Sequence, residues 1–323
     1  MIDTGLSSST AAATASASGA RTTAATARRA LVLTVAFAAL WAVLEIALGA
    51  SLRQPYDLMQ VVWWRYATHL ALLVAIFGWQ RPSRLWRTER TTLQLGRSLL
   101  MLVMPLSFAM SLSFGASPGF VWTGFWIAPL AILLLARWLL NEQAPRLLWA
   151  CSAFVPALAV VIHEPQVPAG VGALMLPLLM ALSFSLYVIA TRALQRERLL
   201  TNLFYTAFGV FVLLTPFMPH VWVWPTAHDA LVLCGIGAIG LVALALLDRS
   251  VERNNASTVA PILGTHLLFG IVLSALHGGP VHRRDLLAIV LLAGMSALLW
   301  HRAAALRAEP PAQPPVAVEG ALR

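Results

Sequence analysis

Residues 115–165 read GASPGFVWTGFWIAPLAILLLARWLLNEQAPRLLWACSAFVPALAVVIHEP, and this stretch decides the fold. It contains two apolar runs, about Pro118 to Leu140 and about Leu147 to Ile162, which only the polar turn NEQAPR separates. A helix rises about 1.5 Å per residue, so each run is long enough to cross a hydrocarbon layer of roughly 30 Å. Two spanning helices joined by so short a turn must lie side by side and antiparallel.

The same design returns in residues 255–302, NASTVAPILGTHLLFGIVLSALHGGPVHRRDLLAIVLLAGMSALLWHR. Ala256 and Ser257 lie 140 residues after Ala116 and Ser117, and a Leu-Leu pair recurs at an offset of 139 residues. A hairpin that repeats at this distance predicts an internal duplication. The whole molecule should then consist of two copies of one unit.

The composition of the chain is typical of an integral membrane protein. Of its 323 residues, 59% are hydrophobic and 11% are charged, and the mean hydropathy is +0.78. A soluble domain carries about twice this share of charge. The net charge of +9 is the excess of 22 basic residues, all of them Arg, over 13 Asp and Glu residues. No basic run alternates with aromatic residues, so nucleic-acid binding is not expected.

Ten apolar runs between residues 30 and 302 predict ten membrane-spanning helices. The flanking residues 1–29 and 303–323 are rich in Ala with Ser and Thr, or in Ala with Pro, and are predicted to be disordered tails. The predicted spans cover about residues 30–48, 58–79, 98–114, 118–140, 147–162, 171–191, 201–217, 230–247, 256–276 and 286–301.

Arginine collects on alternate connections between these spans. Eighteen Arg residues lie in the two tails or after the second, fourth, sixth and eighth spans, and only Arg53, Arg283 and Arg284 lie on the other side. Short Arg-rich connections stay in the cytoplasm, so both termini are predicted to be cytoplasmic in a cell-membrane protein. Five spans per copy is an odd number, so residues 30–163 and 170–302 should form two inverted five-helix repeats. Such repeats predict inward-open and outward-open states of similar free energy.

Four stretches of the chain resemble one known family. The turn of the first hairpin has the form L-x-E-x-x-x-R at Leu140, Glu142 and Arg146. The second span reads QVVWWRYATHLALL with Arg65, and LQLGRSLLML places Arg97 at the start of the third span. Together with GALMLPLLMALSFSLYVIATRAL in the second half, their order resembles the EamA-domain family of the drug/metabolite transporter superfamily. The resemblance spans the whole predicted membrane region and implies transport of a small organic molecule, such as a metabolite, amino acid or drug.

One position departs from the family pattern. Many relatives carry an acidic residue in the second-half hairpin, where this chain has His277, Gly278, Gly279 and Pro280. If that carboxylate helps to latch a gate in the relatives, the resemblance implies a latch on one side only in this chain.

Two charged residues lie well inside predicted spans, away from the span ends, where each charge costs roughly 2.5–3.5 kcal/mol on insertion scales. Glu45 lies late in the first span and Arg65 early in the second, so both should sit at a similar depth in the outer half of the membrane. We expect these two side chains to approach one another. The pair either is a structural ion pair, or it opens to bind a charged or zwitterionic solute or to exchange a proton.

Four further residues are candidates for solute binding or coupling. His69 and His266 lie near the middle of their spans, where an imidazole can bind an anion, relay a proton or simply join two helices through a hydrogen bond. Trp41 and Trp126 could form an aromatic wall for a flat or cationic solute. Trp122, nearer to the outer end of its span, could share this role or be an interfacial anchor.

Polar residues at the cytoplasmic ends of the spans are expected to be structural. Tyr187 is predicted to be an interfacial anchor, and Glu142 is predicted to pair with an Arg on either side of its own turn. Asp248 and Glu252 lie among further arginines and are expected to form a solvated cluster.

The chain shows no enzyme motif: it has no nucleophile elbow, no phosphate-binding glycine loop, no HExxH and no Cys/His cluster. We therefore expect no catalytic residue, no cofactor and no metal. The sequence predicts an all-α secondary transporter that moves a small organic solute by alternating access. Its expected partners are the solute, the lipid bilayer and, as one option, a second copy in a homodimer. The alternative is a lipid-carrier flippase or a non-transporting accessory subunit.

Overall fold

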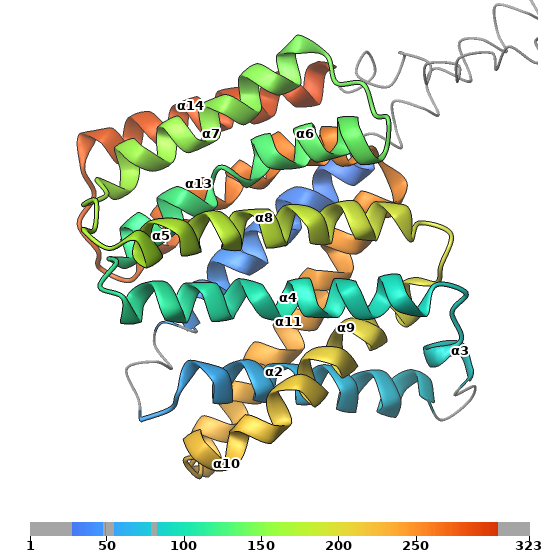
Figure 1. Ribbon diagram of the computed structural model, residues 1–323. Coiled ribbons are helices and arrows are strands. Elements are labelled where there is room, and N and C mark those ends of the chain that lie inside the picture. Colours follow the sequence, from blue (N-terminus) through green and yellow to red (C-terminus); the bar gives the residue numbers. More distant parts are fainter. Residues whose placement is uncertain (1–27, 48, 50–54, 79–82, 303–323) are drawn as a thin grey trace, which may run out of the picture.

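The computed structural model describes residues 28–47, 49, 55–78 and 83–302. All regular structure in these ranges is helical, and none of the described residues forms a strand. Ten helical segments are long and apolar enough to cross a membrane. The protein is therefore a multi-pass α-helical membrane protein, as predicted (Figure 1). Most of the two predicted tails lies outside the described residues.

The spanning segments run alternately in opposite directions through the bundle (Figure 1). Most arginines lie on the connections at one end, which we name the arginine-rich end and which is on the right in Figure 1; the other is the arginine-poor end. In chain order the segments are the first helix (Arg28–Ala47), α2 (Leu58–Leu73) with η1 (Val74–Gly78), the short α3 (Ser83–Trp86), α4 (Thr91–Ser113), α5 (Pro118–Phe125), α6 (Ala128–Leu139), α7 (Arg146–His163), α8 (Val171–Ala193), α9 (Leu199–Leu214) with η2 (Thr215–Phe217) and α10 (Met218–Val221), α11 (Ala227–Arg253), α12 (Ala256–Val259), η3 (Ala260–Gly264), α13 (Thr265–Leu276) and α14 (Arg283–Arg302).

Helix α8 packs against α4, α5, α6 and α11 and so lies at the centre of the bundle (Figure 1). The approach between α5 and α8 is so close that a Cβ atom on Gly124 would lie 2.6 Å from Cβ of Pro177. Ser185 Oγ of α8 also donates a hydrogen bond to the carbonyl oxygen of Ala128 in α6, 3.2 Å away. Small and hydroxyl-bearing residues thus allow these membrane helices to pack closely.

The fourth and ninth spans are interrupted part-way along their length, and the seventh is interrupted by η2. The fourth span is divided into α5 and α6 at Trp126 and Ile127, and the ninth is divided by the 3₁₀ turn η3 between α12 and α13. A proline lies at each break, Pro129 at the start of α6 and Pro261 in η3. Proline removes a backbone donor from the helical hydrogen-bond ladder, which accounts for the breaks. The two spans hold corresponding positions in the two predicted five-helix units.

Helices α4 and α11 are longer than the hydropathy pattern predicts. Helix α4 begins at Thr91, before the predicted start at residue 98, and α11 continues to Arg253, beyond the predicted end at residue 247. The additional turns carry Gln94, Arg97 and Asp248, all fully buried. Hydropathy excludes such residues from a span, but here they are buried between helices. Arg97 pairs with Asp248, and Gln94 donates a hydrogen bond to Asn202.

Candidate functional site

Two cavities meet at Glu45 and Trp122, which line both of them. The first, named the aromatic cavity, has a volume of about 340 Å³ and contains Arg65 as its second charged residue. Its other lining side chains are mostly apolar, and aromatic rings come from Trp41, Tyr66 and Phe108. A carboxylate, a guanidinium and several rings therefore face one cavity.

The second, named the histidine cavity, has a volume of about 490 Å³ and is lined by Trp126, His163 and His266 among others. It extends to the arginine-poor end, where His282 of the α13–α14 connection lines it. The aromatic cavity reaches the same end, at Pro118 in the first turn of α5. Neither cavity is lined by a residue from a connection at the arginine-rich end.

Glu45 contacts His266 and not Arg65, so the predicted Glu45–Arg65 contact is wrong. The carboxylate oxygen Oε2 of Glu45 lies 3.1 Å from Nε2 of His266, within ion-pair distance but without the alignment of a hydrogen bond. His266 comes close because it follows the break in the ninth span directly. Glu45 and Arg65 still line the same aromatic cavity, but they form no ion pair with each other. Among the described residues, no group of three His, Cys, Asp or Glu is placed to hold a metal ion.

Arg65 is held on the side of α2 that faces α11. A Cβ atom on Gly240 of α11 would lie 2.6 Å from Nε of Arg65, so the absence of a side chain there makes room for the guanidinium. That guanidinium lies 5.6 Å from the ring centroid of Tyr66, and its buried Nε atom has no hydrogen-bond partner. His69, one turn further along α2, is fully buried and lines neither cavity.

Aromatic rings surround the contact between Glu45 and His266. The ring centroid of Trp41 lies 4.9 Å from that of His266 and 6.2 Å from that of Trp126. Trp122 also belongs to this cluster, 6.3 Å from Trp41 and 6.2 Å from His266. Trp122 therefore faces the interior and is not an interfacial anchor. Such rings bind flat groups and attract cations through their faces.

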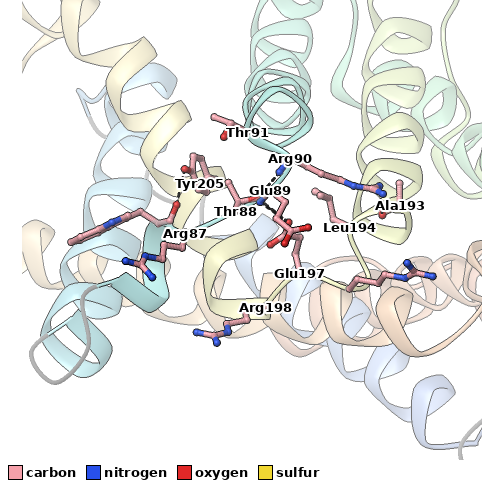
Figure 2. A pocket seen from close by; sticks show the side chains of 12 residues that line it. Arg87, Thr88, Glu89, Arg90, Thr91, Ala193, Leu194, Glu197, Arg198 and Tyr205 are labelled. Carbon is pink, nitrogen blue, oxygen red and sulfur yellow. Dashed lines mark hydrogen bonds between the residues drawn. The ribbon is translucent and has the colours of Figure 1, made fainter.

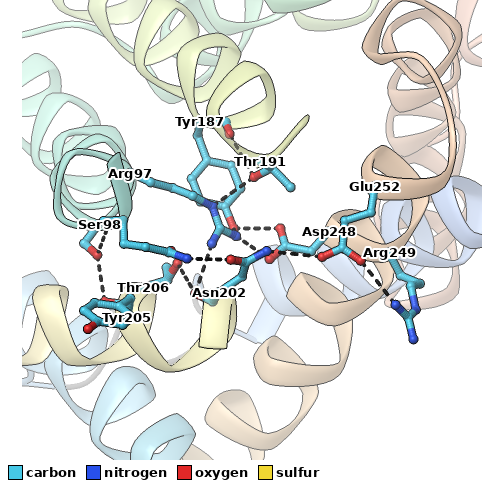
Figure 3. A network of polar contacts seen from close by, with 11 residues as sticks. Arg97, Ser98, Tyr187, Thr191, Asn202, Tyr205, Thr206, Asp248, Arg249 and Glu252 are labelled. Carbon is cyan, nitrogen blue, oxygen red and sulfur yellow. Dashed lines mark hydrogen bonds and ion pairs between the residues drawn. The ribbon is translucent and has the colours of Figure 1, made fainter. Parts of the chain in front are cut away.

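A second polar cluster, which the sequence did not reveal, lies near the arginine-rich end (Figure 3). The fully buried guanidinium of Arg97 pairs with Asp248 and donates hydrogen bonds to the hydroxyl of Tyr187 and to Oγ1 of Thr191, the latter 2.9 Å away. It also donates to the carbonyl oxygen of Asn202 at 3.0 Å. Tyr187 in turn donates to Oδ1 of Asp248 at 2.9 Å. We name Arg97, Tyr187, Thr191, Asn202 and Asp248 the Arg97 cluster.

This cluster corrects two predictions. Tyr187 is not an interfacial anchor, because it is buried and bonded to both charges. Asp248 is not part of a solvated cluster, because its side chain is fully buried. Glu252 lies at the edge, where it accepts a hydrogen bond from Nδ2 of Asn202 at 3.2 Å and pairs with Arg249 at 3.3 Å.

Glu142 joins the first helical hairpin to the start of the second. Its carboxylate accepts hydrogen bonds from the backbone N–H groups of Ala256 and Ser257, at 3.2 and 3.0 Å, and from Oγ of Ser257 at 2.7 Å. It also lies 3.4 Å from Nε of Arg192. Glu142 is therefore structural, as predicted, but it pairs with α8 and α12 rather than with an Arg beside its own turn.

A third and larger pocket, of about 880 Å³, lies on the surface of the arginine-rich end (Figure 2). It is lined by the segment before α4 and by the connection between α8 and α9. The carboxylate of Glu197 lines this pocket and accepts hydrogen bonds from Thr88 Oγ1 and from the N–H of Glu89. No residue singled out from the sequence for solute binding lies in this pocket.

Comparisons with known proteins agree with the fold and point to one functional relative. No family model matches the chain. An S-adenosylmethionine uptake transporter of Rickettsia bellii (strain RML369-C) is 26% identical over 176 residues, which are 54% of this chain and only 60% of the length of that curated relative. A solved structure, described only as the crystal structure of a protein, matches with a TM-score of 0.73 and 18% identity over 84% of this chain and 98% of that chain. This second likeness concerns the fold alone.

Proposed function

We propose that this protein is a secondary transporter, which carries a small organic solute across the cell membrane by alternating access. The observation that carries the proposal is the pair of cavities at Glu45, which lie beside the breaks in the fourth and ninth spans. Secondary transporters built from two repeated halves bind their solutes beside discontinuous helices in corresponding positions. The similarity to an S-adenosylmethionine uptake transporter supports the same function.

The proposal includes two inverted five-helix repeats, residues 30–163 and 170–302, with both termini in the cytoplasm. Its support is the position of the two broken spans, which lie five spans apart, and the collection of arginine at one end of the bundle. In this orientation the arginine-rich end faces the cytoplasm. The two cavities then extend toward the outside of the cell.

The chemistry of the aromatic cavity favours a solute that carries both a positive and a negative charge. Glu45 and the rings of Trp41 and Trp122 suit a cationic group, whereas Arg65 suits a carboxylate. A zwitterion compensates both charges of the cavity, while a singly charged solute leaves one of them without a counter-charge. S-Adenosylmethionine carries a sulfonium, an amino-acid group and a flat ring system, so it is the first solute to test.

Uptake of radiolabelled S-adenosylmethionine into proteoliposomes, with counterflow as the readout and amino acids and nucleosides as competitors, tests the proposal. We expect saturable uptake in the parent protein and a strong reduction in Glu45→Gln and Arg65→Gln. Glu89→Gln is the matched control, because it removes an exposed carboxylate that lines neither cavity. Flux equal to that of empty liposomes for every solute in the panel, from correctly folded protein, would contradict the proposal.

A further inference from the structure

The Arg97 cluster gathers buried side chains from four helices near the arginine-rich end: α4, α8, α9 and α11 (Figure 3). We propose that it is a gate, which must separate before a solute can pass between the cavities and that end. This inference rests on the proposed transport function. The inference adds to the proposed function by naming the contact that opens during transport.

The cluster joins the two predicted halves of the chain. Arg97 belongs to the first half, residues 30–163, and all its partners in the cluster belong to the second, residues 170–302. Contacts of this kind must break when two repeated halves move against one another. An ion pair across the moving seam is therefore in the position that a gate requires.

The cluster also lies between the aromatic cavity and the arginine-rich end. Helix α4 starts at that end, and Arg97 precedes by one turn Met101, which lines the cavity. Helix α8 ends there, and Tyr187 follows by two turns Met180, which also lines the cavity. On both helices the cluster thus lies between the cavity and the arginine-rich end.

The closed cluster is buried, and its side chains are hydrogen-bonded. Arg97, Thr191, Asn202 and Asp248 have no exposed surface, and Tyr187 has almost none. Separating the charges in a low-dielectric interior is unfavourable unless water or other polar groups replace each partner. The gate should therefore have two distinct arrangements, bonded and hydrated, rather than a continuous range of widths.

The arginine-poor end is closed less firmly. There an ion pair joins Arg284 of α14 to Glu164 after α7, and the two side chains are 30% and 64% exposed. Exposed pairs of this kind contribute little to stability. Both cavities extend to this end. The bonded Arg97 cluster and the weaker opposite end together explain why the cavities are accessible from one side only.

Cysteine accessibility in vesicles tests the gate without any solute. The background carries Cys151→Ala and Cys234→Ala, because Cys234 is exposed. One reporter is Thr206→Cys, at a fully buried position one turn inside Asn202; the other is Ser274→Cys, in the histidine cavity. An impermeant maleimide is applied from each side in turn.

In the parent we expect Ser274→Cys to react from the arginine-poor side and Thr206→Cys to be protected. Asp248→Asn leaves Arg97 without its counter-charge, so labelling of Thr206→Cys from the arginine-rich side should rise roughly tenfold or more as a minor state becomes dominant. Arg146→Gln, which changes an exposed arginine at the same end that does not contact the cluster, should leave labelling unchanged. Tyr187→Phe keeps both charges and removes one hydroxyl, so it should give a smaller rise and serves if Asp248→Asn does not fold.

Equal protection of Thr206→Cys in the parent and in folded Asp248→Asn, or in folded Tyr187→Phe where Asp248→Asn does not fold, would overturn the gate. The outcome is separable from that of the transport proposal, because labelling requires no solute. A parent that transports solute but shows no shift in labelling rejects the gate alone. A shift in labelling without transport of any solute keeps the gate and rejects the proposed function.

Discussion

The Arg97 cluster and the cavities at Glu45 are built from the same kinds of side chain but are in opposite states. In the cluster an arginine, an acid and an aromatic hydroxyl are fully buried and bonded to each other. In the aromatic cavity Arg65 and Glu45 are not paired with each other, and Glu45, which contacts His266, has a side chain that is 31% exposed. Bonded buried charges hold helices together, whereas unpaired charges beside a cavity are available to a ligand. The difference separates a closure from a binding site.

The largest expected effect is on folding, from removing one charge of the cluster. Arg97→Gln should lower the free energy of unfolding by about 3–5 kcal/mol, because Asp248 would then be a buried charge without its partner. Thermal unfolding in detergent measures this. The exposed Arg249→Gln should change stability by less than about 1 kcal/mol. If both variants lost the same stability, burial in the cluster would not be the reason that Arg97 stabilises the fold.

The next effect is on solute affinity, from neutralising the cavity charges. Glu45→Gln and Arg65→Gln should each raise the solute concentration for half-maximal uptake by roughly tenfold or more, since each removes a charge-assisted contact of about 1.5–3 kcal/mol. Their thermal stability should fall far less than that of Arg97→Gln. Competition uptake in proteoliposomes measures the affinity. Variants that unfold like Arg97→Gln would place Glu45 and Arg65 among the structural charges.

The ten spans could be predicted because hydropathy and arginine placement are local properties of the sequence. The sequence placed Glu45, Trp126 and His266 inside their spans as candidates for solute binding, and all three line the histidine cavity. His69 was placed at the same depth but faces away from both cavities. Position along a helix gives depth, but which side of the helix faces a cavity depends on the packing of neighbouring helices.

The Arg97 cluster could not be predicted, for two physical reasons. Arg97 and Asp248 are 151 residues apart in the chain, so no local pattern connects them. Both lie in end turns of their helices, where the sequence resembles a solvated connection and hydropathy ends the span too early. The available signal was Arg97 itself, a charge among apolar residues that needed a partner. Without the third dimension that partner could not be named.

A methyl group on α11 sharpens the comparison by displacing a cavity charge without removing it. In Gly240→Ala the new Cβ atom would lie 2.6 Å from Nε of Arg65, so the helices or the guanidinium must shift. We expect a loss of about 1–3 kcal/mol of stability together with weaker solute binding. Gly235→Ala is the control, because nothing lies within 4 Å of its Cβ position. Its effect should stay below about 1 kcal/mol. Equal effects of the two substitutions would show that the α2–α11 contact does not position Arg65.

The smallest effect is expected at Glu142, which is bonded like the Arg97 cluster but is less deeply buried. Its side chain is 8% exposed and that of Arg192 18%, so water can replace part of what is lost. Glu142→Gln keeps an oxygen acceptor for the start of α12 and removes only the charge, and we expect a loss of about 1 kcal/mol in thermal unfolding. Glu89→Gln, an exposed carboxylate at the same end, is the control. A loss as large as that of Arg97→Gln would mean that pairing alone, and not burial, determines how strongly a charge holds these helices.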